Sequence, residues 1–480
     1  MSLHKNFFYN SILTVSNYIF PLITYPYVSR VLGVTNIGIC NFVDSFVNYF
    51  VLFSMMGMAT IGIREIAGAG TDIDKRNKIF SSLFFLNGIT TLIALVTYIA
   101  CIFLIPELNK YINLLYIGII KLIANFFLIN WLFAGLEDFK YITIRSILVH
   151  SLYVLAVFLF VKTQTDYSIY YLLLTLSIVV NAFINCIYSR RYVRLFIRNI
   201  YIKPFLKPTL ILGLRSFLTS MYTTFNVVFL GMVTTDTEVG YYTTATKLYA
   251  IIIALFSAFT SVMLPRMSSL IADDRINEFK NKINQSIELL LLMSIPLIIY
   301  SIIYAPEIIL FVSGSGYEGA ITPMRLVMPL VLIIGIEQIF IIQTLVPLKA
   351  DKALLINTLF GACIGVIMNF VLVYQYKSIG SSIVWILSEL AVLSSAIYFV
   401  KKKANINLAY KKILIYIVYY IPCIFILYIL SNYNFNFLLK LLIAAILTLI
   451  YALVLNVIIL KNKLAINSFK MLIKRFENAK

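Results

Sequence analysis

The segment Thr24-Tyr25-Pro26-Tyr27-Val28-Ser29-Arg30-Val31-Leu32-Gly33 ends the first long apolar stretch of the chain. A proline inside a membrane helix frees a backbone carbonyl and bends the helix, so the freed group needs protein or water as a partner. Charged side chains inside a membrane also avoid lipid and face the interior of the bundle or a water-filled cavity. The segment therefore predicts a membrane helix whose bend faces protein or water.

The composition of the whole chain agrees with this prediction. Of the 480 residues, 61% are hydrophobic and 12% are charged, against about 25% charged residues in a soluble domain. Apolar stretches of about 20 residues, each long enough to cross a bilayer, recur along the chain. These features predict an all-α integral membrane protein, and the apolar stretch at the N-terminus is interpreted as a retained first span and not as a cleaved signal peptide.

The net charge and the cysteine spacing indicate which ligands and cross-links the chain does not use. The formal charge of +19 lies in loops between apolar segments and not on one soluble basic face, so we expect no nucleic acid. The five cysteines lie singly in apolar segments without CxxC spacing, so we expect neither a metal site nor a structural disulfide.

The hydropathy predicts fourteen transmembrane helices, and the charges predict their orientation. If the N-terminus is cytoplasmic, 31 of the 39 Lys and Arg residues lie in cytoplasmic segments and 5 in outer loops. This bias follows the positive-inside rule and predicts a multi-pass membrane protein with both termini in the cytoplasm. The predicted spans are 8–31, 37–61, 79–104, 112–135, 141–161, 167–189, 207–232, 239–264, 284–305, 325–347, 353–375, 378–400, 412–430 and 435–460.

A weak internal repeat organises these spans. Gly38 and Arg64 are 26 residues apart, as are Gly240 and Arg266, so the two copies are offset by 202 residues. Since the offset covers six spans, the copies share one orientation and are related by a pseudo-two-fold axis along the membrane normal, with the substrate path between them. The predicted domains are a six-helix lobe with its basic cytoplasmic connector, a second six-helix lobe, and helices 13 and 14 with a basic cytoplasmic tail. Their ranges are 1–205, 206–403 and 404–480.

Charges inside predicted spans are the first candidates for function, because each costs about 2.5–3.5 kcal/mol at mid-bilayer. One interpretation is ion pairing, for example of Asp44 with Lys121 or Lys247. The other is a cationic lining for an anionic substrate, with separate groups that couple transport to H⁺ or Na⁺. The lining residues are Lys121, Lys247, Arg30 and Arg215, with Asp44 beside them, and the ion-coupling candidates are Asp44, Glu337, Glu389 and His150.

Other candidates carry weaker arguments. Tyr25 and Tyr242 flank polar helix faces, where aromatic rings could stack on sugars. Three arginines at the ends of spans, Arg64, Arg145 and Arg266, form the predicted cytoplasmic rim, where an anchoring role explains them equally well. No catalytic motif or nucleotide-binding loop occurs, so we expect neither an enzyme nor an ATP-driven pump, and no cofactor.

Several motifs resemble a known family. The segments TYPYVSRVLG (24–33), NIGICNFVDSFVNYF (36–50) and GIREIA (62–67), followed by WLFAGLEDFKYI (131–142) and VGYY (239–242), resemble Wzx-type flippases of O-antigen and capsular polysaccharide. That family belongs to the polysaccharide transporters of a superfamily that also holds multidrug exporters and the lipid II flippase. The resemblance covers roughly residues 6–350, and Ala134 departs from it where a polar residue is expected.

The resemblance implies that the protein flips an undecaprenyl-pyrophosphate-linked oligosaccharide from the cytoplasmic to the outer leaflet by alternating access. It also implies that the glycan and pyrophosphate enter a cationic cavity while the lipid tail stays in the bilayer, next to spans 13 and 14. A polysaccharide polymerase and chain-length proteins are the expected protein partners.

Two alternatives stay open. A cation-coupled multidrug exporter shares the fold but should favour acidic cavity residues. A membrane polysaccharide polymerase or glycosyltransferase usually needs a sizeable outer loop with catalytic residues, and the longest outer stretch, about 306–324, has no such set.

Overall fold

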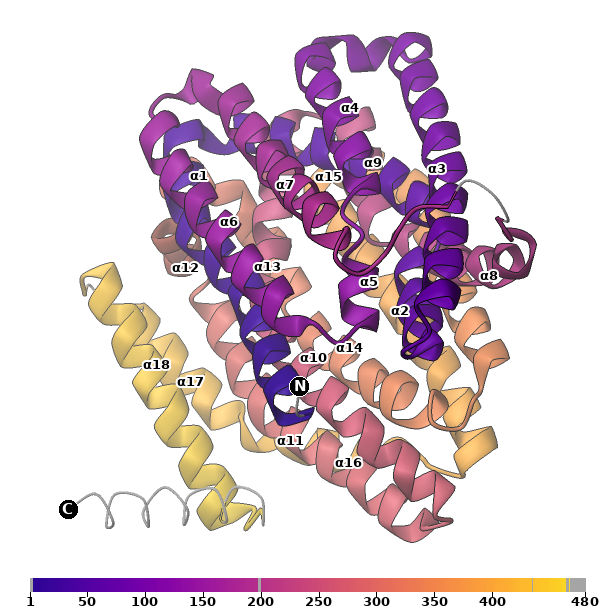
Figure 1. Ribbon diagram of the computed structural model, residues 1–480. Coiled ribbons are helices and arrows are strands. Elements are labelled where there is room, and N and C mark those ends of the chain that lie inside the picture. Colours follow the sequence, from indigo (N-terminus) through magenta and orange to yellow (C-terminus); the bar gives the residue numbers. More distant parts are fainter. Residues whose placement is uncertain (1–2, 197–199, 434, 463–465, 467–480) are drawn as a thin grey trace, which may run out of the picture. The chain divides into compact units, whose positions relative to one another are not determined.

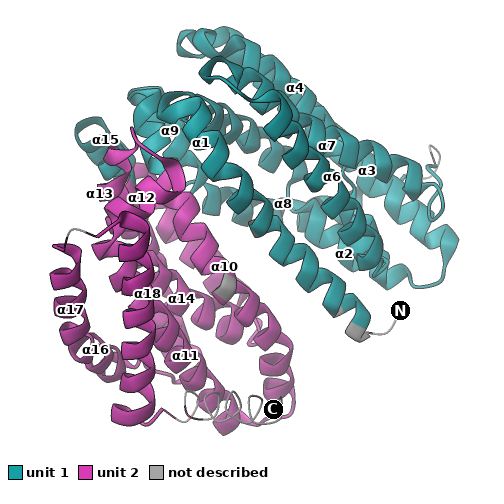
Figure 2. Cartoon of the chain, turned by 90° about the vertical axis from the view of Figure 1, so that its left-hand side faces the viewer, with its two compact units in different colours: residues 1–243, 368–381 teal, residues 244–367, 382–480 magenta. Residues whose placement is uncertain are grey.

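The computed structural model describes residues 3–196, 200–433, 435–462 and 466, and all its regular elements are helices. Figure 1 shows them in chain order. Part of the predicted basic connector (197–199) and most of the predicted basic tail (463–465 and 467–480) lie outside the described residues. The chain forms two compact units, coloured separately in Figure 2. The domain boundaries at 205 and 403 stay a prediction.

Unit 1 comprises residues 1–243 and 368–381. It contains α1 to α9, the beginning of α10 and the middle of α15. Helix α1 packs against α3, α4, α6 and α9, while α4 packs against α7. The helices are α1 (Leu3–Met55), α2 (Met58–Ala69), α3 (Ile73–Leu104), α4 (Ile112–Phe126), α5 (Asn130–Gly135), α6 (Phe139–Phe160), α7 (Tyr167–Ser189), α8 (Lys203–Ser220) and α9 (Thr224–Val233), with 3-10 turns at Pro106–Tyr111 and Gln164–Asp166.

Unit 2 comprises residues 244–367 and 382–480. Helix α11 packs against α14, α16, α17 and α18. The helices are α10 (Asp236–Ala272), α11 (Ile276–Ile303), α12 (Ala305–Ser313), α13 (Ile321–Val327), α14 (Leu330–Phe340), α15 (Asp351–Ala404), α16 (Tyr410–Tyr419), α17 (Ile421–Ser431) and α18 (Phe437–Val454), with a 3-10 turn at Glu318–Ala320 and π-helical turns at Ile341–Leu345 and Leu455–Ile459.

Eleven of the described helical segments are long and apolar enough to cross a membrane, or twelve if α8 and α9, bent by 49°, count as one span. The protein is therefore a multi-pass membrane protein. Two of the segments are unusually long and contain a sharp interruption. Gly33 interrupts α1 with φ 76° and Lys377 interrupts α15 with φ 48°. Both breaks fall between spans that the hydropathy separates, and glycine reaches such a φ without the strain that lysine carries.

The second half of α1 and the start of α10 approach unusually closely in unit 1. Thr35 and Thr237 share a hydrogen bond of 2.9 Å, and Asn41 donates to Thr243 at 3.0 Å. A Cβ atom at Gly38 would lie 1.7 Å from the Asp236 carbonyl oxygen, so only glycine permits this crossing. Each of the two hydrogen bonds joins residues that are 202 positions apart, which is the offset of the predicted repeat.

Candidate functional site

Three polar clusters hold five of the predicted functional side chains, Asp44, Lys121, Arg215, Glu337 and Glu389. The first, the Asp44 cluster, joins α1 to α4. Lys121 is only 5% exposed, and its Nζ donates to Asp44 Oδ1 at 2.5 Å and to Asn48 Oδ1 at 2.8 Å. Asn48 in turn donates to Asp44 Oδ2 at 2.9 Å. The cluster thus contains an ion pair in which each partner makes two hydrogen bonds.

Close packing of α4 brings Lys121 to α1. Gly118 lies one turn before Lys121 on α4, and a Cβ there would lie 2.5 Å from both Tyr98 Oη and Val47 Cγ2. The missing side chain lets α4 approach α1 and α3, which shortens the reach that the lysine needs. Ion pairing, one of the two interpretations of the intramembrane charges, thus describes Asp44 and Lys121 in this structure.

The second cluster, the Arg215 cavity, lies in unit 1 where α8 ends and α9 begins. Its volume is about 460 Å³, within the range of about 300–1,000 Å³ typical of ligand pockets. Arg215 is the one cation in its lining, and the other polar lining residues are hydroxyls of α2, α8 and α9. They are Thr60, Ser216, Thr219, Ser220, Thr223 and Thr224.

Two glycines create this cavity by letting α8 approach the break between α1 and α2. Gly57 has φ 76°, and a Cβ there would lie 2.6 Å from Leu212 Cβ. A Cβ at Gly213 would lie 2.9 Å from Met56 Cα. The interruption between α8 and α9 then turns the N-terminus of α9 toward the lining, at Thr224.

The electrostatics of the Arg215 cavity favour an anion. Among the described residues, no carboxylate lies within ion-pair distance of Arg215. The N-cap residue of α9, Thr223, makes no side-chain cap, and the free N–H groups at a helix N-terminus attract negative charge. The hydroxyls of Ser216, Thr219 and Thr223 all donate to backbone carbonyls of α8, and a bound anion would compete for those protons.

The third cluster, the Glu337–Glu389 pair, lies in unit 2 between α14 and α15. The two carboxyl groups interact directly with each other. Glu389 is 5% exposed and accepts a hydrogen bond of 2.9 Å from Trp385 Nε1, while Glu337 Oε2 is buried without a partner. In the described part of the chain, neither carboxyl group forms an ion pair.

Hydrogen bonds and aromatic packing fix this carboxyl pair. Next to Glu337, Gln338 donates to Ser257 at 2.9 Å and accepts from Thr260 at 3.2 Å, which joins α14 to α10. The Trp385 ring packs edge-on against Tyr249 of α10, with ring centroids 5.0 Å apart. The pair is therefore held by α10, α14 and α15 together.

The other predicted residues lie outside these clusters. Lys247 is half-buried on α10 of unit 2, and Arg30 is exposed on α1, where it donates to the Pro26 carbonyl at 3.4 Å. The His150 ring stacks on Phe20 at 5.3 Å, a packing contact. Tyr25 and Tyr242 are 7% and 2% exposed, so their rings are not available to a sugar in this structure.

The three predicted rim arginines differ in their surroundings. Arg64 and Arg266 are exposed and pair with Glu65 and Glu278, each at 2.8 Å. Arg145 is 6% exposed and donates to Asn185 and, at 3.1 Å, to Asn130. It therefore braces the interrupted helix between α4 and α5 instead of reaching lipid headgroups.

A neighbouring cluster of tyrosines surrounds Asp138. The hydroxyls of Tyr188 and Tyr192 donate to Asp138 Oδ2 at 3.0 and 2.9 Å, and the Tyr188 ring stacks on Tyr141. Tyr192 follows the end of α7, outside the membrane-spanning segments. Burial raises the pKa of Tyr192, and its hydrogen bonds to Tyr188 and Asp138 raise it further, so Tyr192 stays a neutral donor.

Sequence reasoning missed several buried polar contacts. Asn369 donates to Asn226 at 2.7 Å inside unit 1, and Ser286 donates to Gln343 at 2.8 Å inside unit 2. A single amide in an otherwise apolar stretch, such as Asn369 in Ile367-Met-Asn-Phe-Val371, is the signal that marks these positions.

Comparison with known proteins places the chain in a family. The family model described as "Polysaccharide biosynthesis protein" matches residues 3–271, more than half of the chain. The chain belongs to this family. It is also 26% identical over 405 residues to the "Putative O-antigen transporter" of Escherichia coli (strain K12), covering 84% of this chain and 97% of that protein. The predicted relationship to polysaccharide flippases is thereby confirmed.

Solved structures agree on the fold. The lipid II flippase MurJ in an inward closed conformation matches with a TM-score of 0.73 and 16% identity, covering 94% of this chain and 99% of that chain. An inward-facing multidrug resistance MATE family transporter of the MOP superfamily matches with a TM-score of 0.62 and 17% identity, covering 79% and 92%. These proteins are transporters or flippases and not enzymes, in line with the expectation for this chain.

Proposed function

We propose that this protein flips an undecaprenyl-pyrophosphate-linked oligosaccharide from the cytoplasmic to the outer leaflet of the bacterial inner membrane, for O-antigen, capsule or exopolysaccharide synthesis. The observation that carries the proposal is the Arg215 cavity, which combines a cation that has no ion-pair partner among the described residues, a set of hydroxyls and a helix N-terminus. Guanidinium groups bind phosphate oxygens in bidentate geometry, and hydroxyls suit sugars and phosphates alike. The family and the O-antigen transporter relative support this substrate class.

The length of the helices supports fourteen crossings. Phe8–Ala69 and Asp351–Ala404 have 62 and 54 residues, which is about 80–90 Å of helix against a hydrocarbon core of about 30 Å. Each is interrupted near its middle, at Gly33 and Lys377. If each crosses twice, the twelve candidate spans become fourteen, with both termini on one side, which we take to be the cytoplasm.

Contacts between equivalent residues support the two-fold relation of the lobes (1–205 and 206–403, followed by 404–480). Near a two-fold axis, a residue contacts its own symmetry mate. Thr35 with Thr237 and Asn41 with Thr243 are pairs of this kind, since each joins positions 202 residues apart. Two lobes that meet at such an axis can rock against each other, which is the motion that alternating access needs.

For the coupling ion we propose H⁺ bound by the Glu337–Glu389 pair. Two buried carboxylates in direct contact repel each other strongly when both are ionised, so such pairs hold a shared proton. Two neutral side chains lie next to the pair: Trp385 donates to Glu389 and packs against Tyr249. Loss of the proton would place a net charge between α10, α14 and α15 and so favour a rearrangement of these helices.

Genetic complementation tests the proposed function. The gene would be deleted and restored as wild type, Arg215→Gln, Arg215→Lys or, as a matched control, Lys402→Gln, which removes a charge at the exposed end of α15. Surface polysaccharide and lipid-linked intermediates would be measured at equal protein levels. Since a hydrogen bond to a charged group contributes about 1.5–3 kcal/mol, Arg215→Gln should lower polymer yield by about tenfold or more.

The outcomes separate the alternatives. Loss of polymer in the deletion strain, with repeat units retained on the cytoplasmic leaflet, supports the flippase. Intact polymer in the deletion strain favours a drug exporter, whereas unpolymerised units on the outer leaflet favour a polymerase. Polymer yield with Arg215→Gln equal to wild type would remove the cavity from the proposal. Co-purification with a polysaccharide polymerase or chain-length protein tests the proposed partners separately.

A further inference from the structure

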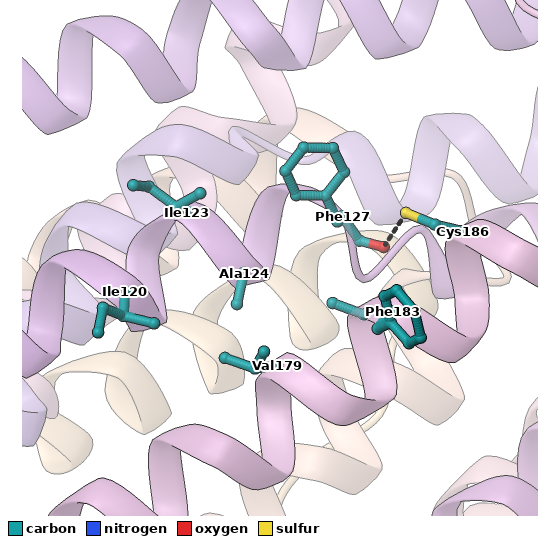
Figure 3. Close-up of a pocket in the computed structure, with 8 residues that line it drawn as sticks. Ile120, Ile123, Ala124, Phe127, Val179, Phe183 and Cys186 are labelled. Carbon is teal, nitrogen blue, oxygen red and sulfur yellow. Dashed lines mark hydrogen bonds between the residues drawn. The ribbon is translucent and has the colours of Figure 1, made fainter.

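An apolar groove runs between α4 and α7 of unit 1 (Figure 3). Its volume is about 380 Å³. Ile120, Ile123 and Phe127 border it on the α4 side, and Val179 and Phe183 border it on the α7 side. Ile120, Ile123 and Phe183 are 47%, 42% and 66% exposed, so the groove opens to the surroundings of unit 1.

The groove exists because of small side chains and an interrupted helix. Ala124 and Ala182 are buried in its floor, where leucine or phenylalanine would fill the space. Helix α4 ends at Phe126, and the following carbonyl of Phe127 contacts Cys186 Sγ at 4.0 Å. Arg145 and Asn185 brace this interruption from the protein interior, so the shape of the groove is fixed.

The dimensions of the groove fit part of one hydrocarbon chain. From Ile120 to Phe127 the α4 side extends about 10 Å, roughly a third of the hydrocarbon core. The lining is apolar, so a bilayer lipid can enter it without losing hydrogen bonds. A groove of this length holds the part of one acyl chain nearest the headgroup and is too short for a whole long prenyl chain.

Two arginines lie at the end of the groove. Arg190 follows Cys186 by one turn, directly after the end of α7, and so lies on the same side of the helix as Cys186. Arg191 lies next to it and places its guanidinium 5.1 Å from the centre of the Tyr188 ring. Both side chains are exposed, and in the described residues neither forms an ion pair. Charge complementarity therefore favours a lipid with an anionic phosphate.

We propose that the α4–α7 groove is a binding site for an anionic phospholipid, with one acyl chain in the groove and the phosphate on Arg190 and Arg191. The site joins the interrupted α4 to α7 from the lipid side and so stabilises the bundle of unit 1. This inference rests on the geometry of unit 1 and does not depend on the transported substrate.

Native mass spectrometry of the full-length, delipidated protein in detergent tests this site. Dioleoyl phosphatidylglycerol is the probe, with dioleoyl phosphatidylcholine and short-chain dihexanoyl phosphatidylglycerol as controls. We expect dioleoyl phosphatidylglycerol to bind most tightly. Because each cation near a lipid surface contributes about 1 kcal/mol, Arg190→Gln with Arg191→Gln should weaken binding by about tenfold or more, while Lys402→Gln with Lys403→Gln should not.

A second pair of variants tests the groove itself. Val179→Trp fills the groove and should weaken binding similarly, whereas Val180→Trp, at the next and 40% exposed position, should leave it unchanged. Equal binding of phosphatidylglycerol and phosphatidylcholine, or equal binding of the short-chain lipid, would overturn the proposal. So would retention of binding in Val179→Trp, because the phosphate would then bind without the groove.

Discussion

The Asp44 cluster of unit 1 and the Glu337–Glu389 pair of unit 2 differ in how the charge of their acidic side chains is compensated. Both place ionisable side chains deep in membrane helices. Asp44 has a lysine at 2.5 Å and an asparagine at 2.9 Å, so its charge is compensated. Glu389 has another carboxyl group and an indole as neighbours. The first cluster is an ion pair, whereas the second brings two acidic groups together, for which we propose a shared proton.

We interpret the first cluster as a structural ion pair and the second as the proposed proton switch. A compensated ion pair costs energy when one partner is removed, because the other is left buried and unpaired. A carboxyl pair that shares a proton loses little when one member becomes an amide, because glutamine resembles the neutral acid in shape. The two clusters should therefore differ in stability effects and in their response to pH.

The largest expected effect is on stability, in the Asp44 cluster. Lys121→Met should lower the free energy of unfolding by up to about 3 kcal/mol, since it removes the ion-pair partner of the Asp44 carboxylate, whose side chain is 28% exposed. Adding Asp44→Asn should restore most of this loss. Thermal unfolding in detergent, analysed as a double-mutant cycle, measures the coupling. If Lys121→Met alone unfolds like wild type, the pair is not structural.

Removal of a carboxyl group should change pH response more than stability. The chain has two tryptophans, so in a Trp131→Phe background the fluorescence of Trp385 reports on Glu389, to which its indole donates. We expect a change in fluorescence as rising pH removes the shared proton. Glu337→Gln should abolish or displace this change while altering the free energy of unfolding by less than about 1.5 kcal/mol.

The Lys121→Met and Asp44→Asn double variant is the matched control for this titration, because it alters buried charges in the other unit. Its fluorescence titration should follow that of the Trp131→Phe parent. A titration that is insensitive to Glu337→Gln, or equally sensitive to the Asp44 cluster, contradicts a shared proton at the carboxyl pair.

The smallest expected effect is the coupling energy of a neutral hydrogen-bonded pair, which serves as a reference for the coupling energy of Asp44 and Lys121. Asn226 and Asn369 share a 2.7 Å hydrogen bond, and such interhelical bonds in membranes contribute about 0.6 kcal/mol on average. Alanine at both positions should give a coupling energy of that size, well below that of Asp44 and Lys121. Equal coupling energies would show that charge adds nothing in the Asp44 cluster.

The sequence predicted the helical class and the approximate spans well, because apolar length alone separates them. It also placed turns next to Gly33 and Lys377, where the structure interrupts α1 and α15. The described part of the chain contains eleven or twelve candidate spans, because each of these two helices continues on both sides of its interruption. The count of fourteen spans therefore stays a prediction.

The sites were less predictable, because they depend on which helices meet. Pairing of Asp44 with Lys121 was one of two open interpretations, and only the packing of Gly118 against α1 decides it. Glu337 and Glu389 are 52 positions apart, and nothing local indicates that they touch. Arg145 is at the end of a predicted span, yet it is buried because it donates hydrogen bonds to Asn130 and Asn185.

A flipping assay in proteoliposomes tests most directly whether the protein moves a lipid-linked oligosaccharide across the bilayer. Purified wild-type protein and Arg215→Gln would be reconstituted with a lipid-linked oligosaccharide, and the fraction of glycan that becomes accessible to an external glycosidase would be followed over time. We predict protein-dependent flipping that falls by about tenfold or more in Arg215→Gln and persists in Lys402→Gln. Wild-type proteoliposomes that flip no faster than protein-free liposomes, with the protein folded and a pH gradient of either sign applied, would contradict the central claim.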